Sequence, residues 1–336
     1  MKVCLSGLGL LDQANVEFVK KFTELARQNP GPFTLVEKTS DADLILGIYG
    51  ARTPGKVTEE QKKLLRERAD DFYVFETSDL ALLAYQGVYC VLGKSRGRNH
   101  RFRTYCFPME NNYIEEAYRE TIEPDLFFSF LGGSTSWLRK RMYRLDFGRP
   151  DVIIRDTSYH QEWTAWSPEW EQNKRDYARL MARTKFVICP RGVTPTAGRM
   201  YEGMQMGRVI VVISDEYYPP EGPDWEKFMI RVPERDLPRL VEILTPYQDK
   251  WREMGKIARV EWEKWFAPNM WFQRIIENCV SISRTRRCPE ASHLWKVPYL
   301  EVSQKVRLKT YGTLKNVART ILKTAGLAKK FRLNRA

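Results

Sequence analysis

Two arginines, two threonines and a glutamate stand close together in the segment FVICPRGVTPTAGRMYEGMQMGRVIVVISD, residues 186–215. We expect a helix to begin near Thr196, after the loop that holds Thr194, and to place Arg199 about three residues inside it. A helix N-terminus has unpaired N–H groups and a partial positive charge, so a cation there is favourable only beside an anion. Threonine hydroxyls and the guanidinium groups of Arg191 and Arg199 complete a set that suits a phosphate. Glu202 follows Arg199 by three residues, so the alternative is an ion pair on a solvated helix face.

Two short apolar runs flank this segment and predict the strands that position it. Residues 186–189 and 209–213 are rich in Val and Ile, as buried strands are. Gly207 stands where the helix must end, because glycine adopts the left-handed conformation that closes many helices. The segment therefore predicts a strand–loop–helix–strand unit of an α/β domain.

The rest of the chain repeats this alternation and predicts two α/β domains in tandem. Amphipathic helical patterns at 12–28 and 58–69 alternate with five apolar runs, at 2–5, 33–36, 44–48, 72–75 and 87–92. We expect an N-terminal domain over residues 1–121, a C-terminal domain over 122–283 and a basic tail over 284–336. Two such domains, with a cleft between the carboxyl ends of their strands, are suited to binding two substrates.

The composition predicts an ordinary globular body with a charged tail. The chain has 336 residues and a net charge of +13, but residues 281–336 alone hold 14 Lys and Arg against 2 Asp and Glu. No apolar run is long enough for a transmembrane helix, and the N-terminus predicts a first strand rather than a signal peptide. The six cysteines form no CxxC or Cys/His cluster, so we expect free thiols, no zinc site and a cytoplasmic location.

The tail has apolar residues near one helical face and lysines and arginines around them, over residues 311–336. A basic amphipathic helix is typical of proteins that bind anionic membrane surfaces, which predicts a peripheral location on the inner membrane face. The alternative is a solvated tail. Nucleic-acid binding is not expected, because the excess positive charge lies in the tail and not in the folded body, and because no nucleic-acid-binding motif is present.

The motifs of the C-terminal half resemble those of a known family. TKFVICPRGVTPTAGRMYEGMQMGRVIVVISD at 184–215 and PPEGPDWEKFMIRVPERDLPRL at 219–240 are similar in order and spacing to the core of exostosin-like proteins, glycosyltransferase family 47. Without an N-terminal membrane anchor, the chain looks like a bacterial member. The resemblance implies a GT-B fold, with two Rossmann-like domains facing a cleft. It also implies inverting transfer of a hexose or pentose from a nucleotide sugar, usually a UDP-sugar, without an essential metal or other cofactor.

The resemblance also implies roles for the residues of the first motif. The C-terminal domain of the family binds the donor nucleotide, so Arg199, Thr194 and Thr196 are expected to hold the diphosphate and Glu202 the ribose hydroxyls. Arg191 is expected either to assist the phosphates or to brace the loop. The acceptor is expected to be a glycan or a lipid-linked glycan, as in polysaccharide biosynthesis.

Two further loops follow predicted strands of the same domain. The loop GGSTS at 132–136 contains Gly133 and precedes Arg139 and Arg141, of which the resemblance favours Arg141 as a contact to the donor. In the loop at 214–225, Asp215 and Asp224 are candidates for the donor sugar, since carboxylates suit its hydroxyls. Trp225 is expected to be a core anchor.

An inverting transfer needs a general base that takes the proton of the acceptor hydroxyl. Asp12 and His160 are candidates, because each follows a predicted strand, where loops line the cleft. Asp156 is a third candidate, because it lies close to His160 at the end of its strand. Asp12 is equally suited to cap a helix. Two other readings are a catalytically inactive sugar-binding relative and a dinucleotide-dependent oxidoreductase. The second fails, because the GLG at 7–9 is followed by Asp12 where the fingerprint needs glycine.

Overall fold

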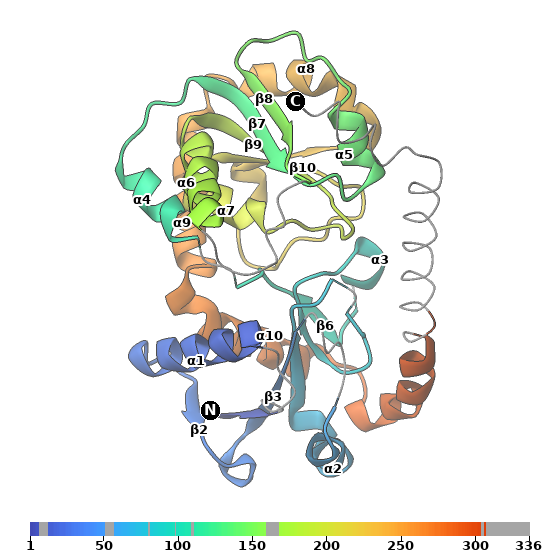
Figure 1. Cartoon of the computed structure of the whole chain (residues 1–336). Coiled ribbons are helices and arrows are strands. Elements are labelled where there is room, and N and C mark those ends of the chain that lie inside the picture. The colour runs from blue at the N-terminus through green and yellow to red at the C-terminus, as the bar shows by residue number, and fades with distance from the viewer. Residues whose placement is uncertain are drawn as a thin grey trace.

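The computed structural model describes residues 1–6, 13–50, 57–79, 81–97, 99–108, 111–158, 168–303 and 306 (Figure 1). Asp12, His160 and the tail from residue 307 onward lie outside the described residues. None of the helices that the structure describes is long and apolar enough to span a bilayer. All six cysteines are free thiols, as expected.

The first sheet has six parallel strands, formed by residues 2–104, and confirms the N-terminal α/β pattern. Its order is β2 (Thr34–Val36), β1 (Lys2–Ser6), β3 (Leu44–Tyr49), β4 (Phe72–Glu76), β5 (Gly87–Tyr89) and β6 (Phe102–Thr104). The helices of this part are α1 (Gln13–Gln28), α2 (Glu59–Glu67) and α3 (Lys94–Gly97). Helix α2 begins with a capping box in which Thr58 and Gln61 satisfy each other's backbone N–H groups.

The second sheet has five parallel strands and lies above the first in Figure 1. Its order is β11 (Met229–Val232), β10 (Val209–Ile213), β9 (Thr184–Pro190), β7 (Leu126–Gly132) and β8 (Val152–Asp156). Side chains alternate between two buried faces along each central strand, since Phe186 and Ile188 pack on one side and Val187 and Cys189 on the other. Two parallel sheets with helices on their faces are the two Rossmann-like domains that the GT-B fold requires.

Helices cover this second sheet on both faces. They are α5 (Trp137–Met142), α6 (Pro168–Ala182), α7 (Arg199–Gln205), α8 (Leu240–Leu244) and α9 (Trp251–Trp265). Short 3-10 turns at Trp225–Lys227, Glu234–Arg239, Thr245–Tyr247 and Pro268–Met270 connect the elements from β10 onward.

Two helices pack across the chain order of the domains. Helix α4 (Asn112–Arg119) packs on α6 and α7 of the second domain, although it precedes residue 121. Helix α10 (Trp271–Thr285) packs on α1, β5 and β6 of the first domain, although most of it lies before residue 283. The domain boundaries at residues 121 and 283 therefore stay predictions. The packing of these two helices shows that the chain crosses between the domains more than once.

Direct contacts join the two domains. Gly93 forms an isolated antiparallel bridge with Tyr217, and the N–H of Lys94 donates to the Glu216 carbonyl at 3.0 Å. The Tyr105 hydroxyl donates to the Trp265 carbonyl at 2.6 Å. The loop after β10 is thus part of the junction between the domains.

Candidate functional site

The candidate site lies where β7 and β9 end and α7 begins. Gly132 is the last residue of β7, and Pro190 is the last residue of β9. Helix α7 starts at Arg199, three residues later than the expected start near Thr196, so Arg199 is its first residue rather than an interior one. Thr196 is buried in the loop before it, and the Thr194 hydroxyl donates to the Thr196 carbonyl at 3.2 Å.

The end of α7 is as predicted. Gly207 has a φ of 64°, and its N–H donates to the Met204 carbonyl at 2.9 Å. The N–H of Arg208 donates to the Gly203 carbonyl at 2.9 Å, which completes a Schellman motif. A Cβ atom on Gly203 would lie 2.6 Å from Ile210 Cδ1, so glycine there lets α7 pack closely on β10. This close packing fixes the orientation of Arg199 and Glu202 at the strand ends.

Tyr177 of α6 connects Arg199 to Glu202. Its hydroxyl accepts a hydrogen bond from Arg199 Nε at 3.1 Å and donates one to Glu202 Oε2 at 2.6 Å. Arg199 Nη2 also donates to the Leu131 carbonyl. The alternative of a direct ion pair on a solvated face is wrong, because no Arg199–Glu202 ion pair occurs and both side chains are half-buried.

A second arginine lies beside Arg199. The guanidinium carbons of Arg199 and Arg139 lie 4.3 Å and 5.3 Å from the centroid of the same Phe130 ring. Arg139 donates to the Pro190 carbonyl at 3.2 Å and to the Gly133 carbonyl at 3.2 Å. Both cations are thus held by carbonyl oxygens, a hydroxyl and an aromatic face.

The electrostatics of this pair are unusual for arginines. Among the described residues, neither Arg139 nor Arg199 has a carboxylate within ion-pair distance. Burial, together with the like charge of Arg199, lowers the pKa of Arg139 to about 10. Burial alone would lower the pKa of Arg199, but Tyr177, Cys189 and the nearby Glu202 carboxylate together outweigh it and raise that pKa. Two partly desolvated cations without a carboxylate partner form a site that favours an anion.

Arg191 has a different environment from the other two arginines. Its Nε donates to Glu234 Oε1 at 2.7 Å, and its backbone N–H donates to the Ile213 carbonyl at 3.0 Å. The Glu234 N–H in turn donates to Asp215 Oδ1 at 3.1 Å. Of the two expected roles for Arg191, these contacts favour bracing the loops that follow β9 and β10.

The sequence of the second domain matches a known family. Residues 124–246 match the model described as "Exostosin GT47 domain". This segment is an exostosin GT47 domain. The resemblance stated from the motifs is thereby confirmed.

Curated relatives of the GT47 domain are similar over limited stretches. A probable glycosyltransferase of Arabidopsis thaliana is 37% identical over 71 residues, which cover 20% of this chain and 15% of the relative. The Exostosin-1 homolog of Caenorhabditis elegans is 29% identical over 123 residues, which cover 34% of this chain and 32% of the relative. The chain thus spans less than a third of the length of each of these relatives.

A solved structure gives a more distant match. The sucrose-phosphate synthase from Thermosynechococcus elongatus is 11% identical, with a TM-score of 0.44 over 83% of this chain and 99% of that chain.

Arg139, rather than Arg141, points to the strand ends of the GT47 domain. The two residues are two positions apart on α5, so they face different directions. Arg141 is exposed, whereas Arg139 is half-buried against Pro190 and Gly133. The expectation that favoured Arg141 is not supported by this geometry. Gly133 lies beside the arginine pair, as expected of the loop after β7.

The loop after β10 is held by contacts of its own. Asp215 is exposed and accepts from the Glu234 N–H, while Asp224 is exposed and pairs with Lys227 at 2.8 Å. Trp225 is buried, and its indole N–H donates to the Pro220 carbonyl at 2.8 Å, as expected of a core anchor. Contact of Asp215 and Asp224 with a donor sugar therefore stays a prediction.

Asp156 is the one base candidate within the described residues. It ends β8, next to β7, and its Oδ1 accepts hydrogen bonds from the Ser158 hydroxyl and from the Ser158 N–H, the latter at 2.9 Å. Ser158 Oγ also accepts from the Ser134 N–H at 2.7 Å, which ties this strand end to the loop after β7. Asp12 and His160 lie outside the described residues, so their roles as bases stay predictions.

Sequence reasoning missed Tyr177 and underrated Arg139. Tyr177 lies 22 residues before Arg199, on a helix whose pattern shows only an amphipathic face. The one usable signal was its position beside the buried Ala178 and four residues before the buried Met181, which places it near the side of α6 that faces the sheet.

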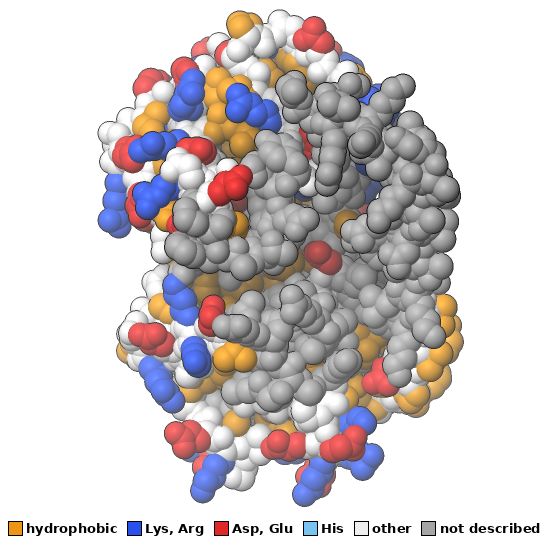
Figure 2. Space-filling view, viewed as in Figure 1, with side chains coloured by type: hydrophobic (Ala, Val, Ile, Leu, Met, Phe, Trp, Pro, Cys, Tyr) orange, Lys and Arg blue, Asp and Glu red, His pale blue; other side chains and the backbone are white. Residues whose placement is uncertain are grey.

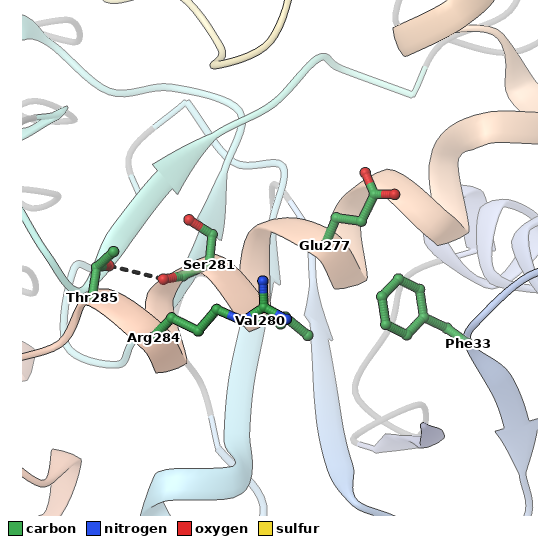
Figure 3. A pocket seen from close by; sticks show the side chains of 6 residues that line it. All are labelled: Phe33, Glu277, Val280, Ser281, Arg284 and Thr285. Atoms are coloured by element: carbon green, nitrogen blue, oxygen red, sulfur yellow. Dashed lines mark hydrogen bonds between the residues drawn. The ribbon is translucent and has the colours of Figure 1, made fainter.

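A separate hollow of about 300 Å³ lies along α10, and none of the candidate residues lines it (Figure 3). Figure 3 shows Phe33 facing the helix, from which Glu277, Val280, Ser281, Arg284 and Thr285 project. Within the described ranges, no group of three or more His, Cys, Asp or Glu side chains is placed to hold a metal ion.

Proposed function

We propose that this protein is an inverting glycosyltransferase that uses a nucleotide-sugar donor, with UDP as the nucleotide. The observation that carries the proposal is the pair Arg139 and Arg199 at the strand ends of an exostosin GT47 domain. These two cations are half-buried, and no carboxylate of the described residues lies within ion-pair distance of either. A diphosphate supplies the negative charge that such a pair favours.

The two arginines and Glu202 have complementary roles in this proposal. Arg199 and Arg139 hold the diphosphate and stabilise the charge that develops on it as the sugar leaves. Glu202 accepts hydrogen bonds from two neighbouring ribose hydroxyls, for which a carboxylate has enough acceptor sites. Tyr177 fixes the distance between the Arg199 and Glu202 side chains, because its hydroxyl is hydrogen-bonded to both of them.

The reaction transfers the sugar in one displacement. The acceptor oxygen forms a bond to the anomeric carbon while the bond from that carbon to the diphosphate oxygen breaks. The proton of the acceptor hydroxyl passes to a general base, for which Asp12, Asp156 and His160 are the candidates. The diphosphate leaves as an anion beside the arginines, so a metal ion is not required for its departure.

The proposed acceptor is a glycan or a lipid-linked glycan. The basic tail supports a location beside an anionic membrane surface, where lipid-linked acceptors lie. Asp215 and Asp224 are proposed as contacts to the donor sugar.

The ribose contact gives a sharp test of this proposal. Glu202→Gln should weaken the binding of UDP about tenfold or more, because an amide replaces a carboxylate acceptor of charged hydrogen bonds. The same substitution should leave the weaker binding of 2′,3′-dideoxy-UDP unchanged, since that ligand lacks both hydroxyls. Equal losses for both ligands would contradict the role of Glu202.

Activity is tested by incubating the wild type with a set of UDP-sugars and detecting UDP release in the presence of glycan acceptors, with and without EDTA. The expected result is release that persists in EDTA. Nucleotide binding without any transfer would instead favour an inactive sugar-binding relative.

A further inference from the structure

The C-terminal segment that follows α10 is anchored on the first domain. It begins with the 3-10 helix η8 (Glu290–Lys296) and continues as a helix over residues 297–303. The buried Glu290 carboxylate accepts from Arg101 Nη2 at 2.5 Å and from the Gln86 N–H at 3.0 Å. Because these contacts are buried, the position of the segment on the domain is fixed.

One face of this segment completes a hydrophobic core. Leu294, Val297 and Leu300 pack against the cluster that includes Tyr85 and Leu82. Glu301 lies partly buried near Tyr85. The inner face is therefore accounted for by packing against the chain itself.

The opposite face is apolar and exposed. Trp295 and Tyr299 are each 75% exposed, and Val302 and Val306 are each 59% exposed. Their spacings of four, three and four residues place them along one side, which we call the outer stripe. Figure 2 shows hydrophobic side chains along the edge of the molecule where Figure 1 places this segment. Two aromatic side chains this exposed in one row indicate a surface that meets a partner.

The charges around the outer stripe point to the chemistry of that partner. Lys296 is exposed beside it, with its ammonium group 5.3 Å from the centroid of the Trp295 ring. Over residues 291–336 the one carboxylate side chain is Glu301, which belongs to the inner face. The sequence from 304 to 336 holds ten Lys and Arg and no Asp or Glu.

We propose that the outer stripe inserts into the interface of a membrane with anionic lipids. Trp and Tyr favour the boundary between headgroups and acyl chains, because each has an apolar ring and a polar tip. The neighbouring cations attract the anionic headgroups. A second copy of the chain fits this surface less well, since it would bring together two copies of residues 304–336, which are basic, contain no Asp or Glu and repel each other. The inference names a contact surface and does not depend on the donor site.

Co-sedimentation of the full-length protein with vesicles tests this inference. The vesicles contain either phosphatidylcholine alone or phosphatidylcholine with phosphatidylglycerol. The variant Trp295→Ser/Tyr299→Ser removes the aromatic part of the stripe, and Val260→Ser on α9 is the control, because Val260 is 58% exposed on a different surface. Both variants should keep the wild-type melting temperature, since the changed side chains are exposed.

The wild type and Val260→Ser should bind the anionic vesicles and bind pure phosphatidylcholine much less. The double variant should lose about tenfold or more in vesicle partitioning, because interfacial binding scales with the apolar area that enters the membrane. Wild-type binding by the double variant would overturn the proposal and assign the binding to the tail alone. A change of oligomeric state in the double variant, without a change in vesicle binding, would overturn it in favour of a second copy on this surface.

Discussion

Replacement of Tyr177 by Phe isolates the link between Arg199 and Glu202. The change removes one hydroxyl that accepts from Arg199 Nε at 3.1 Å and donates to Glu202 Oε2 at 2.6 Å. A hydrogen bond to a charged group contributes roughly 1.5–3 kcal/mol, and the ring that packs in the same place is retained. We therefore expect the free energy of unfolding to fall by about 2 kcal/mol. Since both ligand contacts lose their common support, we expect UDP affinity to fall about tenfold.

The assay is calorimetric titration with UDP beside urea unfolding of the same samples. The matched control is Tyr113→Phe, which removes a hydrogen bond from a tyrosine hydroxyl to Glu171 at the other end of α6. The control should lose stability and keep the wild-type affinity for UDP. If Tyr177→Phe, like the control, loses stability but keeps the wild-type affinity for UDP, then Tyr177 supports the fold and does not position the nucleotide contacts.

Further predictions concern two arginines of α5 and one buried carboxyl group. Arg139→Ala should weaken UDP binding by about 2 kcal/mol, which is the scale of a hydrogen bond to a charged group. Arg141→Ala should change the UDP affinity less than about twofold. Equal effects of the two substitutions in calorimetric titration would refute the orientation of α5. Burial raises the pKa of Glu76 from 4.5 to about 7, so the folded state binds the proton more tightly than the unfolded state. The resulting stabilisation is complete below about pH 4.5 and is lost as the pH rises to about 7, a change of about 3 kcal/mol. Glu76→Gln should remove this slope when unfolding is measured across that range, and parallel curves for the two proteins would contradict it.

Local patterns predicted most of the elements that hold the candidate site. The Val- and Ile-rich runs gave β9 and β10, since such runs are buried on both faces of a parallel sheet. Gly207 predicted the end of α7, because its φ of 64° favours glycine. The start of α7 was expected too early, since Thr194 and Thr196 are used inside the loop and do not cap the helix.

Contacts between distant segments could not be predicted in the same way. The choice between Arg139 and Arg141 depends on which side of α5 meets the ends of β7 and β9, and that is set by tertiary packing. Tyr177 joins the site through the packing of α6 on the sheet, which periodicity alone does not specify. The return of α10 to the first domain likewise depends on long-range packing that the amphipathic pattern leaves open.

The central claim is that Arg199 binds the diphosphate of a nucleotide sugar. The most direct measurement is calorimetric titration of wild type and Arg199→Ala with UDP, GDP, ADP and CMP, each with and without Mg²⁺. We expect wild type to bind UDP, with an affinity that Mg²⁺ does not change, and we expect Arg199→Ala to lose about 3 kcal/mol, roughly a hundredfold. If the wild type does not bind UDP, or if Arg199→Ala binds UDP with the same affinity as the wild type, the result would contradict the account.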